Sequence, residues 1–600
     1  MFKKISKIYL LLTKKNKNYL FFVILLSFLS SLLDLIGIIS VLPFLSLLVD
    51  PSLLYTNFYL EKINSYLNYD NDQFLIFLGI VSFVIIFLNQ LVRFASKMVS
   101  ITFARSLIYE ITGELFNFYL KQPYNFFSNQ NKNLLIQKCT LYVEHLISGT
   151  LSPYIHIFSQ FLTTTIILGF LLVYQSSIII ILSLFLLSYY LLFYKQVSRK
   201  YDSISKNYSE YFERFSQSLG DAFGVIQQLK LFKNNYFKNN FSYSANLYKK
   251  ANITQNFYGF LPSHFVEVFA YGSILIVSLV LFFQSSDLKN IIPVLGVITI
   301  SLRRIIPGFQ DIYQQILQIR FHAGVFDKIY PDLKKIRYLQ SQKKIKKTKK
   351  NIDENIKFEK NLTVKNLSYN YKNSKNKINI SATIKKGQFI GVCGKTGVGK
   401  STFINILSGL LKKKDGEIKL DGQSTEIFEN HYWKNKIGYA TQNRYIINDT
   451  IVNNISLGEN KDKNHLKTIK KLCKIVDLET HIAKLKSKYN TKIGDSGLRL
   501  SGGQEQKLII ARALYNNPEI VIFDEATNAL DSISEVKILK NIKKNFKNLT
   551  LIFVTHRLNS LKNCDKIIYL ENSRVKSFAE FNKLKKSVPN FNKLILANNY

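Results

Sequence analysis

The glycine-rich stretch at residues 394–401, with the sequence GKTGVGKS, has residue types and a spacing suited to binding nucleotide phosphates. It fits the pattern G-x-x-x-x-G-K-[ST], in which backbone N–H groups of the loop point at phosphate oxygens. The Lys400 amine would reach the β- and γ-phosphates, and the Ser401 hydroxyl would bind Mg²⁺. The candidate nucleotide-binding residues of this loop are Gly394, Lys395, Thr396, Gly397, Val398, Gly399, Lys400, Ser401 and Thr402.

A second group of polar residues lies further along the chain. The segment 500–504 reads LSGGQ, and residues 520–525 read IVIFDE. Four apolar residues followed by two acids are typical of a buried parallel strand that ends at a metal site. We expect Asp524 to hold Mg²⁺ and Glu525 to polarise the attacking water. Ser501, Gly502, Gly503 and Gln504 are further candidate nucleotide contacts.

The chemistry of the glycine-rich loop requires a strand before it and a helix after it. The apolar residues 389–393 predict the strand, and residues 402–407, TFINIL, predict the helix start. The loop would therefore place its N–H groups at a helix N-terminus, where phosphate binds favourably.

In this order, the three motifs resemble those of the ATP-binding cassette (ABC) ATPases. The resemblance implies that Tyr371 stacks on adenine, that Gln442 senses Mg²⁺, and that Asp531 belongs to a loop crossing a dimer interface. It also implies that His556 contacts the γ-phosphate. The implied catalytic residues are Glu525, His556 and Gln442, and the implied metal ligands are Ser401, Gln442 and Asp524.

The chain departs from the family pattern at several positions. Glu505 follows LSGGQ where a basic residue or glutamine is usual, and Asn528 replaces a serine. Ala440 and Thr441 precede Gln442 where Val-Pro is common, and Asp495 stands for a glutamate. None of these changes removes a catalytic group, so the resemblance implies a hydrolysing site.

Six long apolar runs occupy the first half of the chain. About 20 apolar residues cross a bilayer core as a helix, so these runs predict six transmembrane helices. The predicted spans are 19–48, 74–92, 151–174, 177–194, 257–283 and 291–307.

Lysines set the predicted orientation. Six lysines precede the first span, whereas the loop 51–72 carries one lysine and three acids. The positive-inside rule then places the N-terminus and the ATPase domain in the cytoplasm and predicts a multi-pass protein of the cell (inner) membrane. The basic N-terminal segment is too short in its apolar part to span and predicts an interfacial helix.

The predicted fold is an all-α six-helix transmembrane domain followed by an α/β P-loop ABC ATPase domain. The ATPase domain is expected to carry an antiparallel β subdomain and a helical signature subdomain. The long charged segments between spans resemble the exporter type of membrane domain, with short coupling helices expected near 120–127 and 219–223. The predicted boundaries are 1–18 for the interfacial helix, 19–320 for the membrane domain, 321–356 for a basic linker and 357–600 for the ATPase domain.

The net charge of +41 raises the question of nucleic-acid binding. The lysines accompany many asparagines and isoleucines, and loops near anionic lipid favour lysine, so we expect membrane lipids and no nucleic acid as partners. The cysteines, Cys139, Cys393, Cys473 and Cys564, show no metal spacing and indicate a reducing compartment.

One chain carries one phosphate loop and one LSGGQ segment. In the family the signature of one cassette faces the ATP bound to another, so the resemblance implies a dimer, most simply of two copies of this chain. A heterodimer stays open. The implied ligands are ATP and Mg²⁺.

The substrate prediction rests on a finer resemblance, to bacterial flippases of lipid-linked oligosaccharides. The segment 302–307 and the amphipathic stretch 58–67 are similar to theirs. Ionisable residues within spans are costly and therefore suggest function. The candidate substrate residues are Arg304, Arg93, Lys97, His264 and Glu267. The last two could instead form a structural hydrogen bond. A lipid-linked glycan is the first hypothesis, a general exporter of lipids, drugs or peptides the second, and a non-transport ABC ATPase the third.

Overall fold

The computed structural model describes residues 2–128, 130–174, 207–208, 210–231, 235–284, 288–345, 357–370, 378–459, 464–494 and 497–597. These residues form two compact units. Unit 1 comprises Met1–Gln122 and Gln130–Lys347, and unit 2 comprises Pro123–Asn129 and Thr348–Tyr600.

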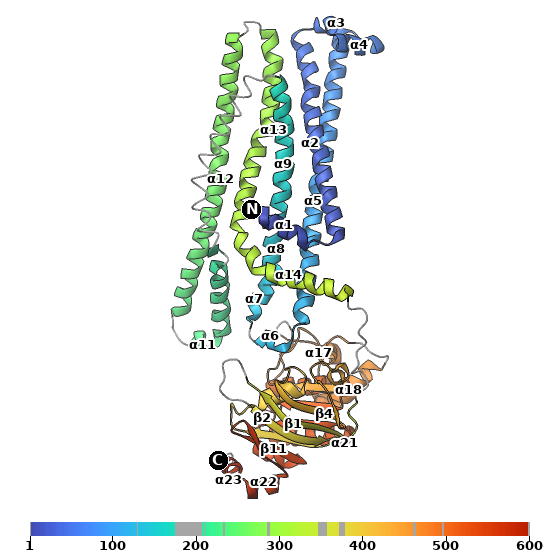
Figure 1. Ribbon diagram of the computed structural model, residues 1–600, viewed down its shortest axis with the longest axis vertical. Helices are drawn as coiled ribbons and strands as arrows, with labels where there is room; N and C mark the ends of the chain where they lie inside the picture. Colours follow the sequence, from blue (N-terminus) through green and yellow to red (C-terminus); the bar gives the residue numbers. More distant parts are fainter. Residues whose placement is uncertain are drawn as a thin grey trace. The chain divides into compact units, whose positions relative to one another are not determined.

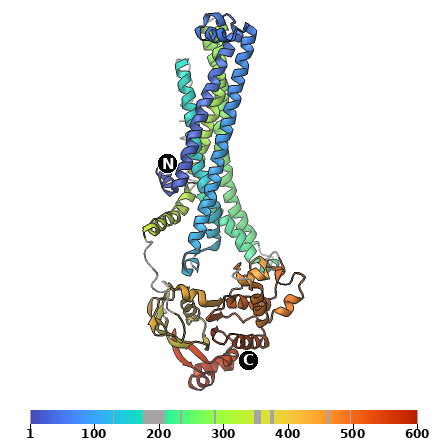
Figure 2. The same ribbon diagram turned by 90° about the vertical axis from the view of Figure 1, so that its right-hand side faces the viewer.

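Unit 1 is helical, and its long helices run along one another in both views (Figures 1 and 2). Helix α5 has 50 residues, which at 1.5 Å each is about 75 Å and well beyond the roughly 30 Å of a bilayer core. The helices are α1 (Phe2–Leu11), α2 (Lys14–Val49), α3 (Leu53–Thr56), α4 (Phe58–Leu67), α5 (Asn71–Leu120), α7 (Lys132–Gln137), η1 (Lys138–Tyr142), α8 (Val143–Leu146), η2 (Ile147–Leu151), α9 (Ser152–Tyr174), α11 (Ile226–Leu231), α12 (Tyr236–Gln284), α13 (Leu288–Phe321) and α14 (Ala323–Ile345).

Among the described residues, four helical segments are long and apolar enough to cross a membrane. They are Lys14–Val49, Asn71–Leu120, Lys132–Tyr174 and Ile291–Phe321. These segments contain four of the six predicted spans. The predicted span 177–194 lies outside the described residues. The predicted span 257–283 falls within α12, and its place in the membrane stays a prediction.

The helices and the two units of the structure can be compared with the predicted domain boundaries. The N-terminal segment forms α1, separate from α2. Much of the predicted linker is helix α14, which belongs to unit 1, and the division between the units falls after Lys347. Of the two predicted coupling segments, 120–127 overlaps α6 (Tyr124–Ser128), which groups with unit 2, whereas 219–223 is helical and groups with unit 1.

Unit 2 is built on a ten-stranded mixed sheet with the order β5-β4-β1-β2-β12-β11-β3-β10-β9-β6. Strands β11, β3, β10, β9 and β6 are mutually parallel, whereas β1 pairs antiparallel with β2 and β4. The strands are β1 (Asn361–Tyr369), β2 (Ile378–Lys385), β3 (Phe389–Gly394), β4 (Asp415–Leu420), β5 (Gln423–Ser424), β6 (Ile437–Ala440), β7 (Asp449–Thr450), β8 (Lys492–Ile493), β9 (Ile520–Asp524), β10 (Thr550–Val554), β11 (Lys566–Glu571) and β12 (Arg574–Ala579).

Apolar side chains on both faces of the parallel strands explain their continuous hydrophobic runs. All five residues of β10 are buried, as are the first four of β9. The helices of unit 2, besides α6, are α15 (Lys400–Leu407), α16 (His431–Lys436), α17 (Ile451–Ser456), α18 (His465–Ile475), α19 (Glu479–Ala483), η3 (Lys488–Asn490), α20 (Gly502–Leu514), α21 (Ser532–Asn545), η4 (Leu558–Asn563), α22 (Phe581–Ser587) and α23 (Pro589–Ala597).

One buried cluster connects this core to the glycine-rich loop. Phe403, on the helix that follows the loop, is fully buried in the same cluster as Trp433. The Trp433 indole N–H donates to the Leu407 carbonyl at 2.7 Å, at the end of that helix. Trp433 is the single tryptophan of the chain, so its emission reports on this core.

We expect Phe403→Ala to lower the free energy of unfolding of unit 2 by about 3–5 kcal/mol, because it leaves a cavity in a packed core. Urea unfolding of the full chain, followed by Trp433 emission, measures the effect. Ile533→Ala, at a side chain 83% exposed, is the control and should change stability by less than about 0.5 kcal/mol. Equal midpoints for the two variants would contradict the packing described.

Candidate active site

Four neighbouring parallel strands end at one edge of the sheet. In the order β3, β10, β9 and β6 they are paired through Val392 with Val554, Val554 with Asp524, and Ala440 with Phe523. The carboxyl ends of parallel strands form the usual binding edge of an open α/β sheet. The glycine-rich loop follows β3, His556 follows β10, Glu525 follows β9 and Gln442 follows β6, so the fold brings these segments together.

The backbone of the glycine-rich loop requires glycine at two places. Gly394 and Gly399 have φ values of +150° and +101°, which L side chains rarely adopt. An added Cβ would lie 2.3 Å from the Leu570 carbonyl oxygen at Gly394 and 2.5 Å from the Ile378 side chain at Gly399. The loop therefore fits tightly against its neighbours and delivers the chain into the N-terminus of α15.

Lys400 begins α15 and turns its side chain back over the loop. Its Nζ donates to the Gly394 carbonyl at 2.8 Å and the Lys395 carbonyl at 3.1 Å. Burial lowers the pKa of Lys400, and interactions with Glu525, Cys393 and Asp524 oppose that shift. The amine is thus placed within the electrostatic reach of both carboxylates at the end of β9.

Glu525 is held by three side chains. His556 Nε2 lies 2.8 Å from Glu525 Oε1, and the amide nitrogens of Gln442 and Asn528 donate to Oε2 at 2.9 and 3.0 Å. The Glu525 backbone has φ of +54°, an uncommon left-handed conformation for a non-glycine residue. Its N–H donates to the Val554 carbonyl at 3.1 Å, which ties this turn to β10.

Asp524, the last residue of β9, accepts a hydrogen bond from the Tyr439 hydroxyl at 3.0 Å. Burial raises the pKa of Asp524, with Glu525 acting in the same direction, whereas Tyr439 and Lys400 oppose it. Burial and the Asp524 charge also raise the pKa of Tyr439. Sequence reasoning did not identify Tyr439, although its place three residues before Gln442, at the end of a strand, is a usable signal.

The residues present fit a magnesium ion bound together with nucleotide phosphates. Mg²⁺ prefers oxygen ligands and keeps much of its coordination for water and phosphate. Asp524 and Ser401 provide a carboxylate and a hydroxyl, and the Gln442 amide provides a further oxygen. Within the described residues, no group of three or more histidine, cysteine or acidic side chains is placed to hold a metal by itself.

The LSGGQ segment caps helix α20. Ser501 Oγ accepts from the Gln504 N–H and the Gln504 side chain accepts from the Ser501 N–H, which is a capping box. The Gln504 amide also lies 3.1 Å from His481 Nδ1. Gly502 and Gly503 form the first turn of α20, so their N–H groups belong to the helix end that favours anions.

The turn after Glu525 is fixed from two sides. The Gln506 side chain on α20 accepts from the Ala529 N–H at 2.7 Å, and Arg557 donates to the Asn528 and Leu530 carbonyls at 2.9 and 2.6 Å. Asp531 then caps α21 by accepting from the Ser534 N–H, and that hydrogen bond lowers the pKa of Asp531. Its predicted role across a dimer interface stays a prediction.

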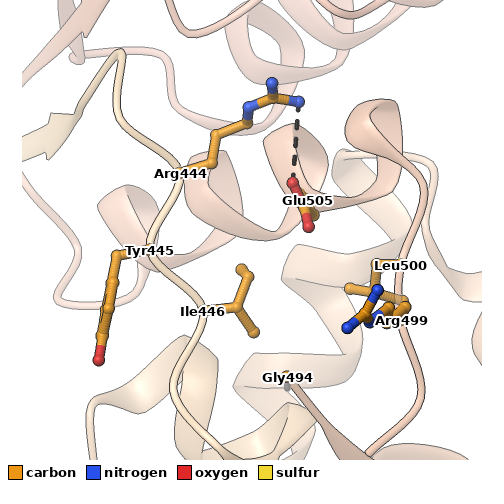
Figure 3. Close-up of a pocket in the computed structure, with 7 residues that line it drawn as sticks. All are labelled: Arg444, Tyr445, Ile446, Gly494, Arg499, Leu500 and Glu505. Atoms are coloured by element: carbon orange, nitrogen blue, oxygen red, sulfur yellow. Dashed lines mark ion pairs between the residues drawn. The ribbon is translucent and has the colours of Figure 1, made fainter. Parts of the chain in front are cut away.

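Arg444, two residues after Gln442, links this loop to the signature helix. Its Nη1 donates to the Gly502 carbonyl at 3.1 Å and lies 3.7 Å from Glu505 Oε2. Figure 3 shows the guanidinium turned toward the carboxylate. Both residues line a pocket of about 400 Å³. The pocket is lined by Arg444, Tyr445, Ile446, Gly494, Arg499, Leu500 and Glu505. Sequence reasoning noticed Glu505 as a departure but not the arginine that accompanies it.

The described part of the structure does not include the side chains of three predicted site residues. Tyr371 lies outside the described residues, and so do the side chains of His264 and Glu267 on α12. Arg304 is placed, but in a different setting from the one expected. It forms an ion pair with Asp34, so the chain itself supplies the anion that the sequence argument sought in a substrate.

Comparison with known proteins agrees with this geometry. The family model described as the ABC transporter matches residues 378–528, and the model described as the ABC transporter transmembrane region matches residues 20–302. This chain is an ABC transporter with fused membrane and ATPase domains. Its whole fold is similar to a bacterial Atm1-family ABC exporter solved with ATP bound, with a TM-score of 0.72 and 17% identity over 97% of this chain and 98% of that one.

Two curated relatives illustrate the range of similar transporters. The alpha-hemolysin translocation ATP-binding protein HlyB of Escherichia coli O6:H1 is 38% identical over 220 residues, which are 36% of this chain and 30% of that protein. The multidrug resistance-like ATP-binding protein MdlA of Buchnera aphidicola is 41% identical over 198 residues, 33% of this chain and 34% of that protein. The matched stretch thus spans only about a third of each relative. Neither name refers to lipid-linked glycans, so the ABC transporter comparisons favour the general exporter over the flippase hypothesis.

We expect Asn528→Ala to lower the rate of ATP hydrolysis at saturating ATP about fivefold with little change in KM. The substitution removes one of three donors that orient Glu525, and a hydrogen bond of this kind contributes about 1 kcal/mol. Steady-state ATPase assays on the full chain measure the effect, and Asn545→Ala on the exposed side of α21 is the control. An unchanged rate for Asn528→Ala would show that Gln442 and His556 suffice.

We expect Arg444→Ala to lower ATP hydrolysis about two- to fivefold, because it leaves the Glu505 charge unbalanced at the end of α20 where anions bind. Glu505→Gln in the same chain should restore most of the activity, and Arg444→Lys should retain more than Arg444→Ala. Equal loss in Arg444→Ala with and without Glu505→Gln would refute this charge balance.

Proposed function

We propose that this ABC transporter uses ATP hydrolysis to export a solute across the membrane as a dimer. The single observation that carries the proposal is the group at the strand edge, where Glu525 contacts Gln442 and His556 beside the glycine-rich loop. That group has the parts of a hydrolytic centre, and the same chain contributes apolar helices long enough to span a bilayer.

Each side chain has a role that follows from its contacts. The loop N–H groups and Lys400 hold the triphosphate, since the amine already reaches oxygen atoms of the loop. Glu525 accepts the proton of the attacking water, and its three donors orient the carboxylate toward the loop. His556 contacts the γ-phosphate. Mg²⁺, held by Ser401, Asp524 and Gln442, would neutralise phosphate charge.

The dimer follows from the position of the signature. The Gly502 and Gly503 N–H groups and the Ser501 hydroxyl form a donor set at the start of α20, suited to a γ-phosphate. In the described residues, the Ser501 hydroxyl accepts from the Gln504 N–H within the helix cap, while Arg444 bonds the Gly502 carbonyl and not its N–H. We infer that this donor set serves the nucleotide of a second copy, which gives each site residues from two chains.

Hydrolysis can reach the membrane helices through Tyr439. Its hydroxyl donates to Asp524, the proposed metal ligand, and Tyr124 on α6 contributes to the raised pKa of Tyr439 after burial and Asp524. Helix α6 groups with unit 2 although its neighbours in sequence belong to unit 1. This supports α6 as a coupling helix that transmits changes at Asp524, as the sequence predicted for residues 120–127.

The substrate is proposed at the level of a general exporter. The relatives are named for hemolysin translocation and for multidrug resistance-like transport. A lipophilic dye and a fluorescent lipid-linked glycan, offered to the same proteoliposomes, separate the two substrate hypotheses. ATP-dependent transport of the dye alone supports the general exporter, and transport of the glycan alone returns the flippase hypothesis.

A mixed dimer tests the proposed function most sharply. Ser501→Arg blocks the signature and Lys400→Ala blocks the loop, so each variant alone should lose at least about 90% of ATP hydrolysis. A heterodimer of the two, isolated through two different tags, keeps one complete composite site and should hydrolyse ATP well above either homodimer.

The controls separate dimerisation from misfolding. Both homodimers should elute like the parent protein in size-exclusion chromatography and unfold at a similar temperature. The proposal fails when Ser501→Arg alone retains the parent rate, or when the heterodimer is no more active than the two homodimers.

A further inference from the structure

Two networks centred on acidic side chains, one buried and one half-buried, cross the helices of unit 1. In the first, Asp34 on α2 is 5% exposed and forms an ion pair with Arg304 on α13. The Asn89 amide on α5 donates to the other oxygen of Asp34 at 2.8 Å. A buried carboxylate is costly unless it is paired and hydrogen-bonded, so this network fixes α2, α5 and α13 to one another.

The second network centres on Asp311 of α13. The Gln160 amide on α9 donates to Asp311 Oδ2 at 3.3 Å. Asp311 also interacts electrostatically with His156 on α9, with Arg93 and Lys97 on α5, and with Arg304 on its own helix. Helices α5, α9 and α13 therefore turn polar faces toward the same region.

The spacing of these residues places those of each helix on one face. On α5, Asn89, Arg93 and Lys97 recur every four residues, which places them on one side of a helix. On α13, Arg304, Asp311 and Gln315 share a side by the same rule, with steps of seven and four. On α9, Ser152, His156 and Gln160 also recur every four residues and share one side of the helix.

The three faces lead into a polar pocket of about 280 Å³. The pocket is lined by Ser100, Ile101, Ala104, Arg105, Ser148, Ser152, Pro153, His156, Gln315 and Gln318. From Asn89 to Ser100, and from Arg304 to Gln315, the helices advance by 11 residues, about 16 Å in each case. The polar row thus continues along three helices toward the end predicted to be cytoplasmic.

The ionisable side chains of the row include more basic than acidic groups. Asp34 and Arg304 neutralise each other, which leaves Arg93 and Lys97 beside the single charge of Asp311. In the part of the chain that the structure describes, no ion pair joins Arg93 or Lys97 to an acid. Lys97 is exposed and Arg93 half-buried, so both can meet a ligand.

We propose that this polar row is a substrate path for a solute with an apolar body and an anionic head group, a carboxylate or a phosphate. Arg93 and Lys97 recognise the head group, and the Asp34–Arg304 pair positions the helices. The proposal rests on the exporter function proposed above and deepens it by naming a substrate class. It also moves the recognition role from Arg304, which is already paired, to the two cations on α5.

A pair of probes that differ only in charge tests the proposal. The full chain is reconstituted in neutral phosphatidylcholine vesicles, and ATPase stimulation is measured with 11-(dansylamino)undecanoic acid and with its methyl ester. For the parent protein, we expect the concentration that gives half-maximal stimulation to be at least about fivefold lower for the acid than for the ester. A preference of this size is expected for recognition by two partly exposed cations. Arg93→Gln combined with Lys97→Gln should abolish this preference and leave stimulation by the ester.

Matched variants keep the result interpretable. Arg303→Gln, at an exposed arginine beside the paired Arg304, should retain the acid preference. Lys97→Arg, which keeps the charge, should retain it as well. Equal stimulation by acid and ester in an active parent protein overturns the proposal but leaves the exporter function intact. Absence of any ATPase activity in the parent overturns both.

Lipid head groups are the competing source of an anion. In vesicles with added phosphatidylglycerol, a double Gln variant that changes only the lipid dependence of ATP hydrolysis, and not the acid preference, would assign Arg93 and Lys97 to lipid contact. That outcome overturns the substrate path, whereas an acid preference that persists in neutral vesicles and disappears in the double variant supports it.

Discussion

The parallel pairing of β3, β10, β9 and β6 is the constraint on which the candidate active site depends. Each strand delivers its functional residues only where it ends, and the register places Val392, Val554 and Asp524 side by side. A shift of this register would separate Glu525 from its donors, since they come from three different segments. The buried apolar residues of the strands therefore stabilise the fold and set the geometry of the chemistry at the same time.

Glu525 illustrates how the fold prepares a reactive group. Glu525 has a left-handed backbone directly after β9, and side chains that follow β6, β10 and the next turn contact its two oxygens. Donors on both oxygens hold the carboxylate in one orientation, which favours its role as a proton acceptor. Tyr439 provides the neighbouring Asp524 with a partner in the same way.

In the helical unit, charged side chains join helices to one another. Asp34 and Arg304 lie on helices far apart in sequence, and each would be costly alone in an apolar setting. Their pairing, with Asn89 as a third member, joins three helices and leaves the α5 cations beside Asp311. Arg304, which the sequence suggests as a ligand-binding residue, is therefore already paired with Asp34 in the fold. Arg93 and Lys97 form no such ion pair among the described residues.

The sequence by itself determined the two-domain order, the apolar helices, the mixed α/β ATPase fold and the glycine-rich, LSGGQ and Asp-Glu motifs. These depend on local patterns, such as runs of apolar residues and glycines at fixed spacing, which hold whatever the rest of the chain does. Only the tertiary structure decided that Asn528 orients Glu525, that Arg444 balances Glu505, and that Arg304 is paired with Asp34. These partners are separated by three, 61 and 270 residues. Even the nearest pair depends on a left-handed turn that no residue-type pattern predicted, because side-chain contacts form only once strand register and helix packing place the groups within hydrogen-bond distance.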